Sequence, residues 1–352
     1  MQRRQARALL GTLWIIDGLL QAQPEMFSRA WPLGQLAQSA MGEPAWVNHS
    51  IFAVLGWFAP SWPWWNLAAV ALQLGIGTGL LLGRAVKPAL AVSFAWLGLI
   101  WWMGEGFGTL PSGFALMLGG APGPALLYAA IGALAWPSGQ QLHCKRPQRH
   151  QRAILARLAV APGACTKWLP GSKRAHHSWR DGSWSYTEPE YPISTRACTG
   201  VWLSFWLGTT AAQAFSPYSS RVLLRSNLKE SEIGQPGYLV AAARWMYTLS
   251  ASHGSQLIWV MAVLQVSIGL AALNRSHRRI WLSVAIALSV FYWVVGQDLG
   301  GVLAGGATDP GLGPLVVLLA AVMWKEPAQV APSHYHGLFN WQRQARVPAK
   351  CS

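Results

Sequence analysis

Long apolar runs separated by short polar segments form the main pattern of this chain. A transmembrane helix needs roughly 20 mainly apolar residues to cross a hydrocarbon core of about 30 Å. Eight runs approach this length, although the last is short, and they predict eight membrane-spanning helices. The predicted spans are residues 7–23, 64–83, 88–106, 122–137, 197–215, 256–274, 280–298 and 312–325.

The same pattern of spaced Gly, Trp and Leu-Gln positions occurs twice along the chain. Residues 66–108 and 258–300 share a Leu-Gln pair followed by Gly, Trp, Gly and Gly at a constant offset of 192. Shorter matches lie on either side: Arg7 and Gly11 recur as Arg196 and Gly200, and Pro122-Gly123 and Trp136 recur as Pro310-Gly311 and Trp324. Each half holds four predicted spans, an even number, so both halves enter the membrane in the same orientation. The sequence therefore predicts an all-α polytopic membrane helix bundle of two parallel four-helix repeats.

The composition excludes an ordinary soluble protein, because 52% of the residues are hydrophobic and only 11% are charged. The net charge of +15 first suggests a nucleic-acid partner. However, if the N-terminus is inside, 22 of the 27 Lys and Arg residues fall in inner segments. The positive-inside rule then predicts a multi-pass plasma membrane protein with both termini cytoplasmic. We interpret the basic charge as a topology signal and a contact with anionic lipid rather than as a nucleic-acid site.

The predicted organisation has four parts. A first membrane repeat covers residues 1–138 and a second covers residues 196–326. The join, residues 139–195, is rich in Arg, Lys, His, Pro, Gly and Ser and is typical of a flexible cytoplasmic linker. Residues 327–352 form a cytoplasmic tail. The His and Cys residues of the linker match no zinc-binding spacing, so we predict no metal site.

Three acidic residues, Asp17, Glu105 and Asp298, fall within or at the edge of predicted spans. An ionisable group near the centre of a spanning helix costs roughly 2.5–3.5 kcal/mol, so each is a candidate for ligand or proton binding. Asp17 lies near the middle of the first span, and its aligned neighbourhood in the fifth span is Phe205-Trp206. It either carries a proton or a ligand, or it is a buried, uncharged carboxyl that is hydrogen-bonded within the bundle.

Glu105 and Asp298 occur in matching glycine-rich motifs, Gly104-Glu105-Gly106-Phe107-Gly108 and Gly296-Gln297-Asp298-Leu299-Gly300. Each half therefore places one carboxyl group at the outer end of its third span. The two groups either form a mouth that binds a cation or a polar substrate, or they cap the short segments that follow.

Gln73 and Gln265 occupy matching positions within the second and sixth spans, each followed by small residues. Small residues let membrane helices approach closely, and a buried amide forms hydrogen bonds across the contact. This pattern favours a packing role for both glutamines, and a ligand role is the alternative.

Sequence signatures of self-sufficient enzymes are missing, since the chain has no Gly-x-Ser-x-Gly, His-Glu-x-x-His, phosphate loop or Cys-x-x-Cys. The sequence therefore leaves enzymatic activity open.

Each half resembles the DoxX-like family of four-helix membrane proteins. In the first half the resemblance is carried by Arg7-Ala8-Leu9-Leu10-Gly11, by Asp17-Gly18-Leu19-Leu20-Gln21 and by the run from Gln73 to Arg84. This sequence has Gln73 and Gln21 where family members commonly carry an acidic residue and a lysine. The resemblance implies a redox-associated membrane subunit, with a quinone as the possible cofactor and a partner subunit that it supports.

Two functions are therefore compatible with the sequence. The first is a redox-associated membrane subunit that is linked to quinone or supports a partner enzyme. The second is a small-molecule or ion transporter with its site at the interface of the repeats.

Overall fold

The computed structural model describes residues 2–28, 30–137, 193–232, 234–274 and 276–324. The predicted tail, and all but the last three residues of the predicted linker, lie outside these ranges. We refer to residues 2–137 as the first half and to residues 193–324 as the second half.

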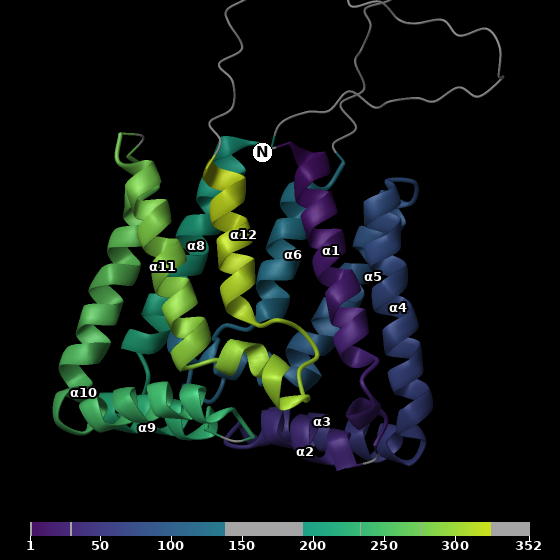
Figure 1. The fold of residues 1–352 in the computed structure, drawn as a ribbon, viewed down its shortest axis with the longest axis horizontal. Helices are drawn as coiled ribbons and strands as arrows, with labels where there is room; N and C mark the ends of the chain where they lie inside the picture. The colour runs from purple at the N-terminus through teal and green to yellow at the C-terminus, as the bar shows by residue number, and fades with distance from the viewer. Residues whose placement is uncertain (1, 29, 138–192, 233, 275, 325–352) are drawn as a thin grey trace, which may run out of the picture. The chain divides into compact units, whose positions relative to one another are not determined.

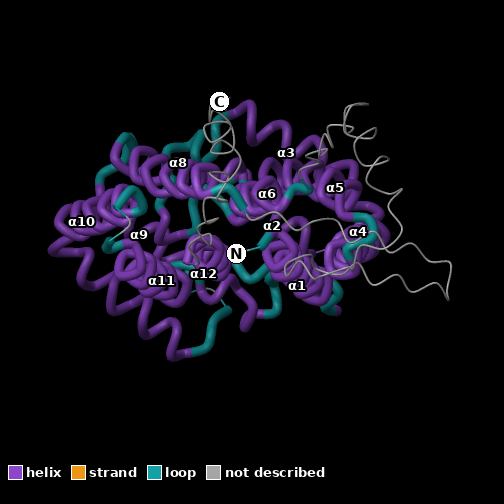
Figure 2. The backbone as a smooth tube through the Cα atoms, turned by 90° about the horizontal axis from the view of Figure 1, so that it is seen from above, coloured by secondary structure: helices purple, strands orange, loops and turns teal. Residues whose placement is uncertain are grey.

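The described residues form helices and connecting loops without strands, which confirms the predicted all-α class (Figure 2). Eight of the helices lie where the apolar runs predicted them, and Figure 1 shows them side by side in one bundle. In the first half these are α1 (Arg3–Gln21), α4 (Trp62–Leu82), α5 (Val86–Leu99) and α6 (Pro124–Ala135). In the second half they are α8 (Thr195–Ala214), α10 (Gly237–Ala271), α11 (Arg278–Val295) and α12 (Leu312–Trp324).

Four helical segments of the described chain are long and apolar enough to cross a membrane. They are Ala45–Leu82, Val86–Gly104, Gly237–Ala271 and Arg278–Val295, and two further apolar helices, α6 and α12, are shorter. The protein is therefore a helical protein with the features of a membrane protein.

Three shorter helices lie across the same end of the bundle (Figure 1). They are α2 (Ala30–Ala40), α3 (Ala45–Phe58) and α9 (Ser220–Glu230). The first part of α10 packs against α9 in the same region. Non-helical backbone at His253 (φ −122°) separates this part from the rest of the helix. Segments 24–63 and 216–255 thus contain short helices between the longer ones.

The third long helix of each half ends in a corner with left-handed backbone. Phe107 and Leu299 have φ values of 58° and 54°. The glycine that follows each is required by close packing: a Cβ on Gly108 would lie 2.0 Å from the oxygen of Pro122, and one on Gly300 would lie 2.6 Å from Pro310. Any larger residue at these glycines would force the two backbone segments apart.

Close helix contacts also recur with the offset of 192. A Cβ on Gly77 of α4 would lie 2.8 Å from Ile15 of α1. One on Gly269 of α10 would lie 3.2 Å from Trp206 and 3.4 Å from Leu207, both on α8. With this offset, Asp17 corresponds to Thr209. With the offset of 189 that relates Arg7 to Arg196, it corresponds to Trp206, as in the sequence alignment.

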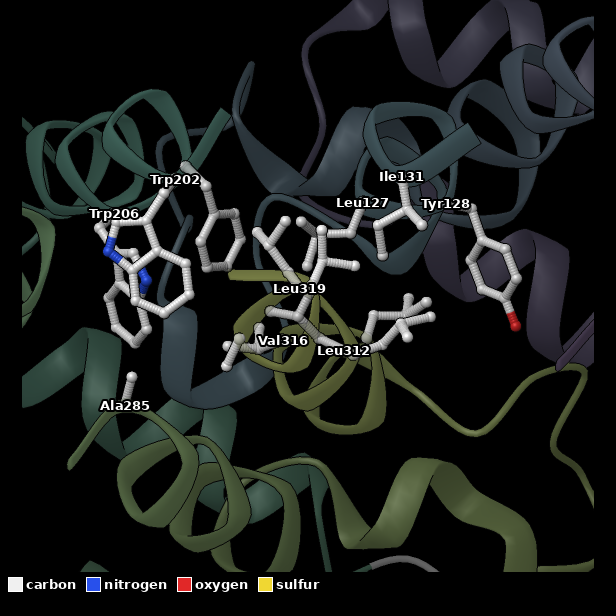
Figure 3. Close-up of a cluster of buried hydrophobic side chains, with 14 of the residues drawn as sticks. Leu127, Tyr128, Ile131, Trp202, Trp206, Ala285, Leu312, Val316 and Leu319 are labelled. Carbon is white, nitrogen blue, oxygen red and sulfur yellow. The ribbon is translucent and has the colours of Figure 1, made fainter. Parts of the chain in front are cut away.

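A large hydrophobic cluster lies between α6, α8, α11 and α12 (Figure 3). Trp202 and Trp206 of α8 are completely buried, and the Trp202 indole donates a hydrogen bond to the backbone oxygen of Ile268 at 3.0 Å. Tyr128 of α6 lies at the edge of this cluster, and its hydroxyl points away from the other labelled side chains (Figure 3). Residues of α6 pack in the same cluster as these tryptophans, and this packing holds Tyr128 in place.

Candidate ligand cavity

A cavity of about 470 Å³ lies within the first half, among α1, α4, α5 and α6. A loop of the second half that contains Gly306, Thr308 and Asp309 completes its wall. This loop packs against the first half, where a Cβ on Gly306 would lie 3.5 Å from the Gln35 amide nitrogen. The cavity is therefore built from both halves of the chain.

Three carboxyl groups from three different segments line the cavity: Asp17, Glu105 and Asp309. Asp17 belongs to the buried face of α1, and only 3% of its surface is exposed. The Tyr128 hydroxyl lies beside this carboxyl and interacts with it. Beyond this contact, neither the hydroxyl nor Asp17 Oδ1 has a hydrogen-bond partner.

Glu105 follows the single π-helical turn Ile100–Gly104 that ends α5. Its Oε1 accepts a hydrogen bond from the backbone nitrogen of Ala125 at 3.0 Å, near the N-terminus of α6. Its Oε2 has no partner. A Cβ on Gly123 would lie 1.8 Å from this oxygen, so the carboxyl needs glycine at that position. One oxygen therefore caps a helix, and the other is free for a ligand.

Asp309 precedes α12, and no sequence pattern had marked it. Its Oδ1 accepts a hydrogen bond from the backbone nitrogen of Gly311 at 2.7 Å, and its Oδ2 accepts one from the Thr308 hydroxyl at 3.3 Å. Burial raises the pKa of Asp309, and these two hydrogen bonds offset part of the increase.

Buried polar atoms without a hydrogen-bond partner gather around this cavity. Such atoms normally find a partner, because leaving one unsatisfied costs about 1–3 kcal/mol. Seven side chains that line the cavity carry one such atom each among the described residues. They are Trp14 Nε1, Asp17 Oδ1, Trp31 Nε1, Gln73 Oε1, Trp96 Nε1, Glu105 Oε2 and Tyr128 OH. Their convergence on one space indicates that a ligand or water satisfies them there.

Aromatic side chains form much of the remaining wall. Trp31 and Trp62 stack with ring centroids 5.1 Å apart, and Trp14 packs against Tyr128 at 5.2 Å. The Trp62 indole is fixed by a hydrogen bond to the backbone oxygen of Met26 at 2.6 Å. The side wall is thus apolar and rigid, and polar atoms are placed at a few points on it, as in small-molecule sites.

Three residues that line the cavity are also exposed on the outer faces of α4 and α5. Among its lining residues, Trp65 of α4 is 39% exposed and Leu99 of α5 is 44% exposed. Ala68 of α4 is exposed as well. Both helices belong to candidate membrane spans, so these exposed lining residues lie on helices that would contact lipid.

The glutamine that matches Gln73 by sequence offset has a different environment. Gln265, which corresponds to Gln73, donates a hydrogen bond to the Tyr292 hydroxyl at 3.2 Å and accepts one from the Thr210 hydroxyl at 3.1 Å. Tyr292 corresponds to Ile100, which lines the cavity of the first half. Gln265 therefore forms the interhelical packing contacts that its sequence pattern favoured, whereas Gln73 leaves its carbonyl oxygen facing a cavity.

Asp298 does not line the cavity. It is half-buried, its Oδ1 has no partner, and burial raises its pKa to about 7. The structure thus brings Asp17, Gln73 and Glu105 together and leaves Gln265 and Asp298 outside. Glu105 and Asp298 therefore do not line this cavity together, and the mouth expected of them stays a prediction.

Metal binding at this site has no geometric support. No group of three or more His, Cys, Asp or Glu side chains within the described ranges lies close enough together to hold a metal ion. The carboxyl groups line the cavity from separate points, which is an arrangement for a molecule rather than for a single ion.

No protein-family model, curated protein or solved structure matches this chain.

Proposed function

We propose that this protein is a multi-pass membrane protein whose cavity in the first half binds a hydrophobic small molecule from the bilayer. The observation that carries this proposal is the convergence of seven unpartnered polar atoms on an apolar cavity, some of whose lining residues are exposed on candidate membrane spans. A molecule dissolved in lipid reaches such a site without crossing water. Its polar group then supplies the missing hydrogen-bond partners.

The membrane arrangement that we propose has eight spans, two parallel repeats and both termini in the cytoplasm. It is supported by the distribution of Lys and Arg and by contacts that repeat along the chain. The Trp101 indole donates a hydrogen bond to the oxygen of Pro122 at 2.9 Å, and the Trp293 indole donates one to the oxygen of Pro310 at 2.7 Å. In this arrangement α2, α3 and α9 lie at the outer surface.

Cysteine accessibility tests this topology. In a chain whose native cysteines are replaced, we expect a membrane-impermeant maleimide to label Leu110→Cys, in an outer loop, from outside intact cells. Arg84→Cys, in an inner turn, should react only after the cells are opened. The reverse pattern would overturn the proposed orientation.

Transport, or binding that leads to transport, is the use of the cavity that the geometry supports best. Residues of both halves line it, with Asp309 from the second half and Asp17 and Glu105 from the first. A site built from two repeats can change shape when the repeats move against each other, as alternating access requires.

A quinone-linked redox role, which the resemblance to DoxX-like proteins implies, is the second candidate. It is favoured by the indole nitrogens of Trp14, Trp31 and Trp96, three unpartnered donors that suit the two carbonyl oxygens of a quinone. In that case the protein would serve as a membrane subunit beside a redox partner, because a quinone exchanges electrons with a second group.

Mass spectrometry of the purified protein tests the proposed binding. We expect a small hydrophobic molecule to co-purify with the wild-type protein in mild detergent and to be depleted in Ile100→Tyr. This variant places in the first half the side chain that is buried at the equivalent position of the second half. A variant with no effect on the cavity, Asp298→Asn, is the matched control. Equal amounts of every small molecule in wild type and Ile100→Tyr would refute the proposal.

A further inference from the structure

We propose that the ligand of this cavity carries a cationic amine on a hydrophobic body, and that Asp17, Glu105 and Asp309 recognise its charge. This inference rests on the proposed function and names its substrate class.

The charges around the cavity are unbalanced. Its wall contains three carboxyl groups and no Lys, Arg or His side chain. A carboxylate removed from water is stable only when it holds a proton or faces a positive charge. The single ion pair of the described residues, between Arg244 and Glu232, lies outside the cavity wall. A cationic ligand supplies the charge that the protein does not.

The unpartnered acceptors point to the same ligand chemistry. Gln73 Oε1 and Glu105 Oε2 accept no hydrogen bond from the protein, and Asp17 Oδ1 has only the Tyr128 hydroxyl beside it. Asp17 and Gln73 are each only 3% exposed, so bulk water does not satisfy them. A protonated primary amine brings three N–H donors, whereas a quinone brings none.

The aromatic wall supports a cation as well. A positively charged group close to the face of an indole is stabilised by the quadrupole of the ring, and Trp is the most effective side chain. Trp14, Trp31, Trp62, Trp65 and Trp96 all line the cavity. The same rings provide the apolar surface that the hydrophobic body of the ligand requires.

Binding of an amine should compete with binding of protons. The titratable groups that face the cavity are Asp17 on α1, Glu105 after α5, Tyr128 on α6 and Asp309 before α12. A primary amine keeps its charge to a pH of about 10. Burial raises the pKa of Asp309, so this carboxyl group loses its proton above its usual range but below that of the amine. The affinity for an amine should therefore increase as the pH rises from 5 to 8.

Two probes of equal size and shape separate charge recognition from hydrophobic binding. They are 1-naphthylmethylamine and 1-naphthylmethanol, titrated by calorimetry into the full-length protein in lipid nanodiscs at pH 8. Empty nanodiscs give the contribution of lipid partitioning. We expect the amine to bind at least about tenfold more tightly than the alcohol, because the loss of a partner from a buried charge pair is costly.

Single substitutions show which carboxyl group recognises the charge of the amine. Asp17→Asn should weaken amine binding at least about tenfold and leave alcohol binding unchanged, whereas Asp298→Asn should leave both unchanged. If Asp17→Asn does not fold, Glu105→Gln provides the same test, since its amide oxygen still accepts from the Ala125 nitrogen.

The outcomes distinguish this inference from the proposed function. Equal affinities for amine and alcohol, both lost in Ile100→Tyr, would overturn the inference and leave the proposed function standing. Quinone binding without amine binding would overturn it in the same way. If neither probe binds and no small molecule co-purifies with the protein, the proposed function itself fails.

Discussion

Tyr292 is completely buried in the second half, whereas Ile100, its counterpart by sequence offset, lines the cavity of the first half. The two residues are 192 positions apart, and both are on or directly after the third long helix of their half. The Tyr292 hydroxyl accepts a hydrogen bond from Gln265 at 3.2 Å, while the corresponding Gln73 has an unpartnered carbonyl oxygen in the cavity. At this position one half of the chain is therefore packed, and the other lines a cavity.

This difference predicts opposite effects for the two glutamines. Gln265→Leu should destabilise the protein by about 1–2 kcal/mol, because it removes the hydrogen bonds to Tyr292 and Thr210. Gln73→Leu should change the stability by less than about 0.5 kcal/mol, because its oxygen has no partner to lose. Unfolding in detergent measures both. Equal losses would show that Gln73 also serves packing.

Asp17 provides a test of charge in the empty cavity. We expect Asp17→Asn to fold with nearly wild-type thermal stability, because a buried carboxyl without a positively charged partner is expected to be uncharged and the amide has the same shape. Asp17→Lys should prevent folding, since it places a larger charged group where only 3% of the surface is exposed. Thermal unfolding measures both variants. Comparable damage by Asn and Lys would mean that Asp17 is ionised and paired in the empty protein.

Asp298 should make the stability dependent on pH without any link to the cavity. Burial raises its pKa from 3.8 to about 7, so the folded protein holds this proton more tightly than the unfolded chain. Its contribution to stability is complete at low pH and is lost as the pH rises from about 4 to 7. Because the group is partly exposed, the loss should amount to about 1–2 kcal/mol.

Asp298→Asn removes this titration. We therefore expect the unfolding temperature of the variant, relative to wild type, to rise between pH 4 and pH 8. A constant difference across this range would indicate an ordinary pKa for Asp298.

The sequence predicted the positions of eight helices because their runs are largely apolar and carry few charges, although only four segments are long and apolar enough to cross a membrane. It also predicted Asp17 and Glu105 as candidates, since a carboxyl group within such a run is costly. The repeat alone did not predict which of Gln73 and Gln265 faces a cavity and which forms packing contacts. That depends on Ile100 and Tyr292, whose difference in volume matters only when the helices are in contact.

The other cavity residues were missed for identifiable reasons. Asp309 lies in a loop between two apolar runs, where an acidic residue is common, and it reaches the cavity only because the loop crosses to the first half. Trp14, Trp96 and Tyr128 resemble the aromatic residues that anchor membrane helices at their ends. Their unpartnered polar atoms are a property of the packed structure and leave no trace in the sequence.

Photolabelling from the bilayer tests the lipid-accessible cavity most directly. An alkyl diazirine dissolved in the lipid forms a reactive species that modifies nearby carboxyl groups, and mass spectrometry then locates each modified residue. We predict labelling of Asp17 and Glu105, its loss in Ile100→Tyr, and no comparable labelling of Asp298. If Asp17 and Glu105 stay unlabelled while the lipid-facing residues of α4 and α5 react, the cavity is closed to the bilayer and this account is contradicted.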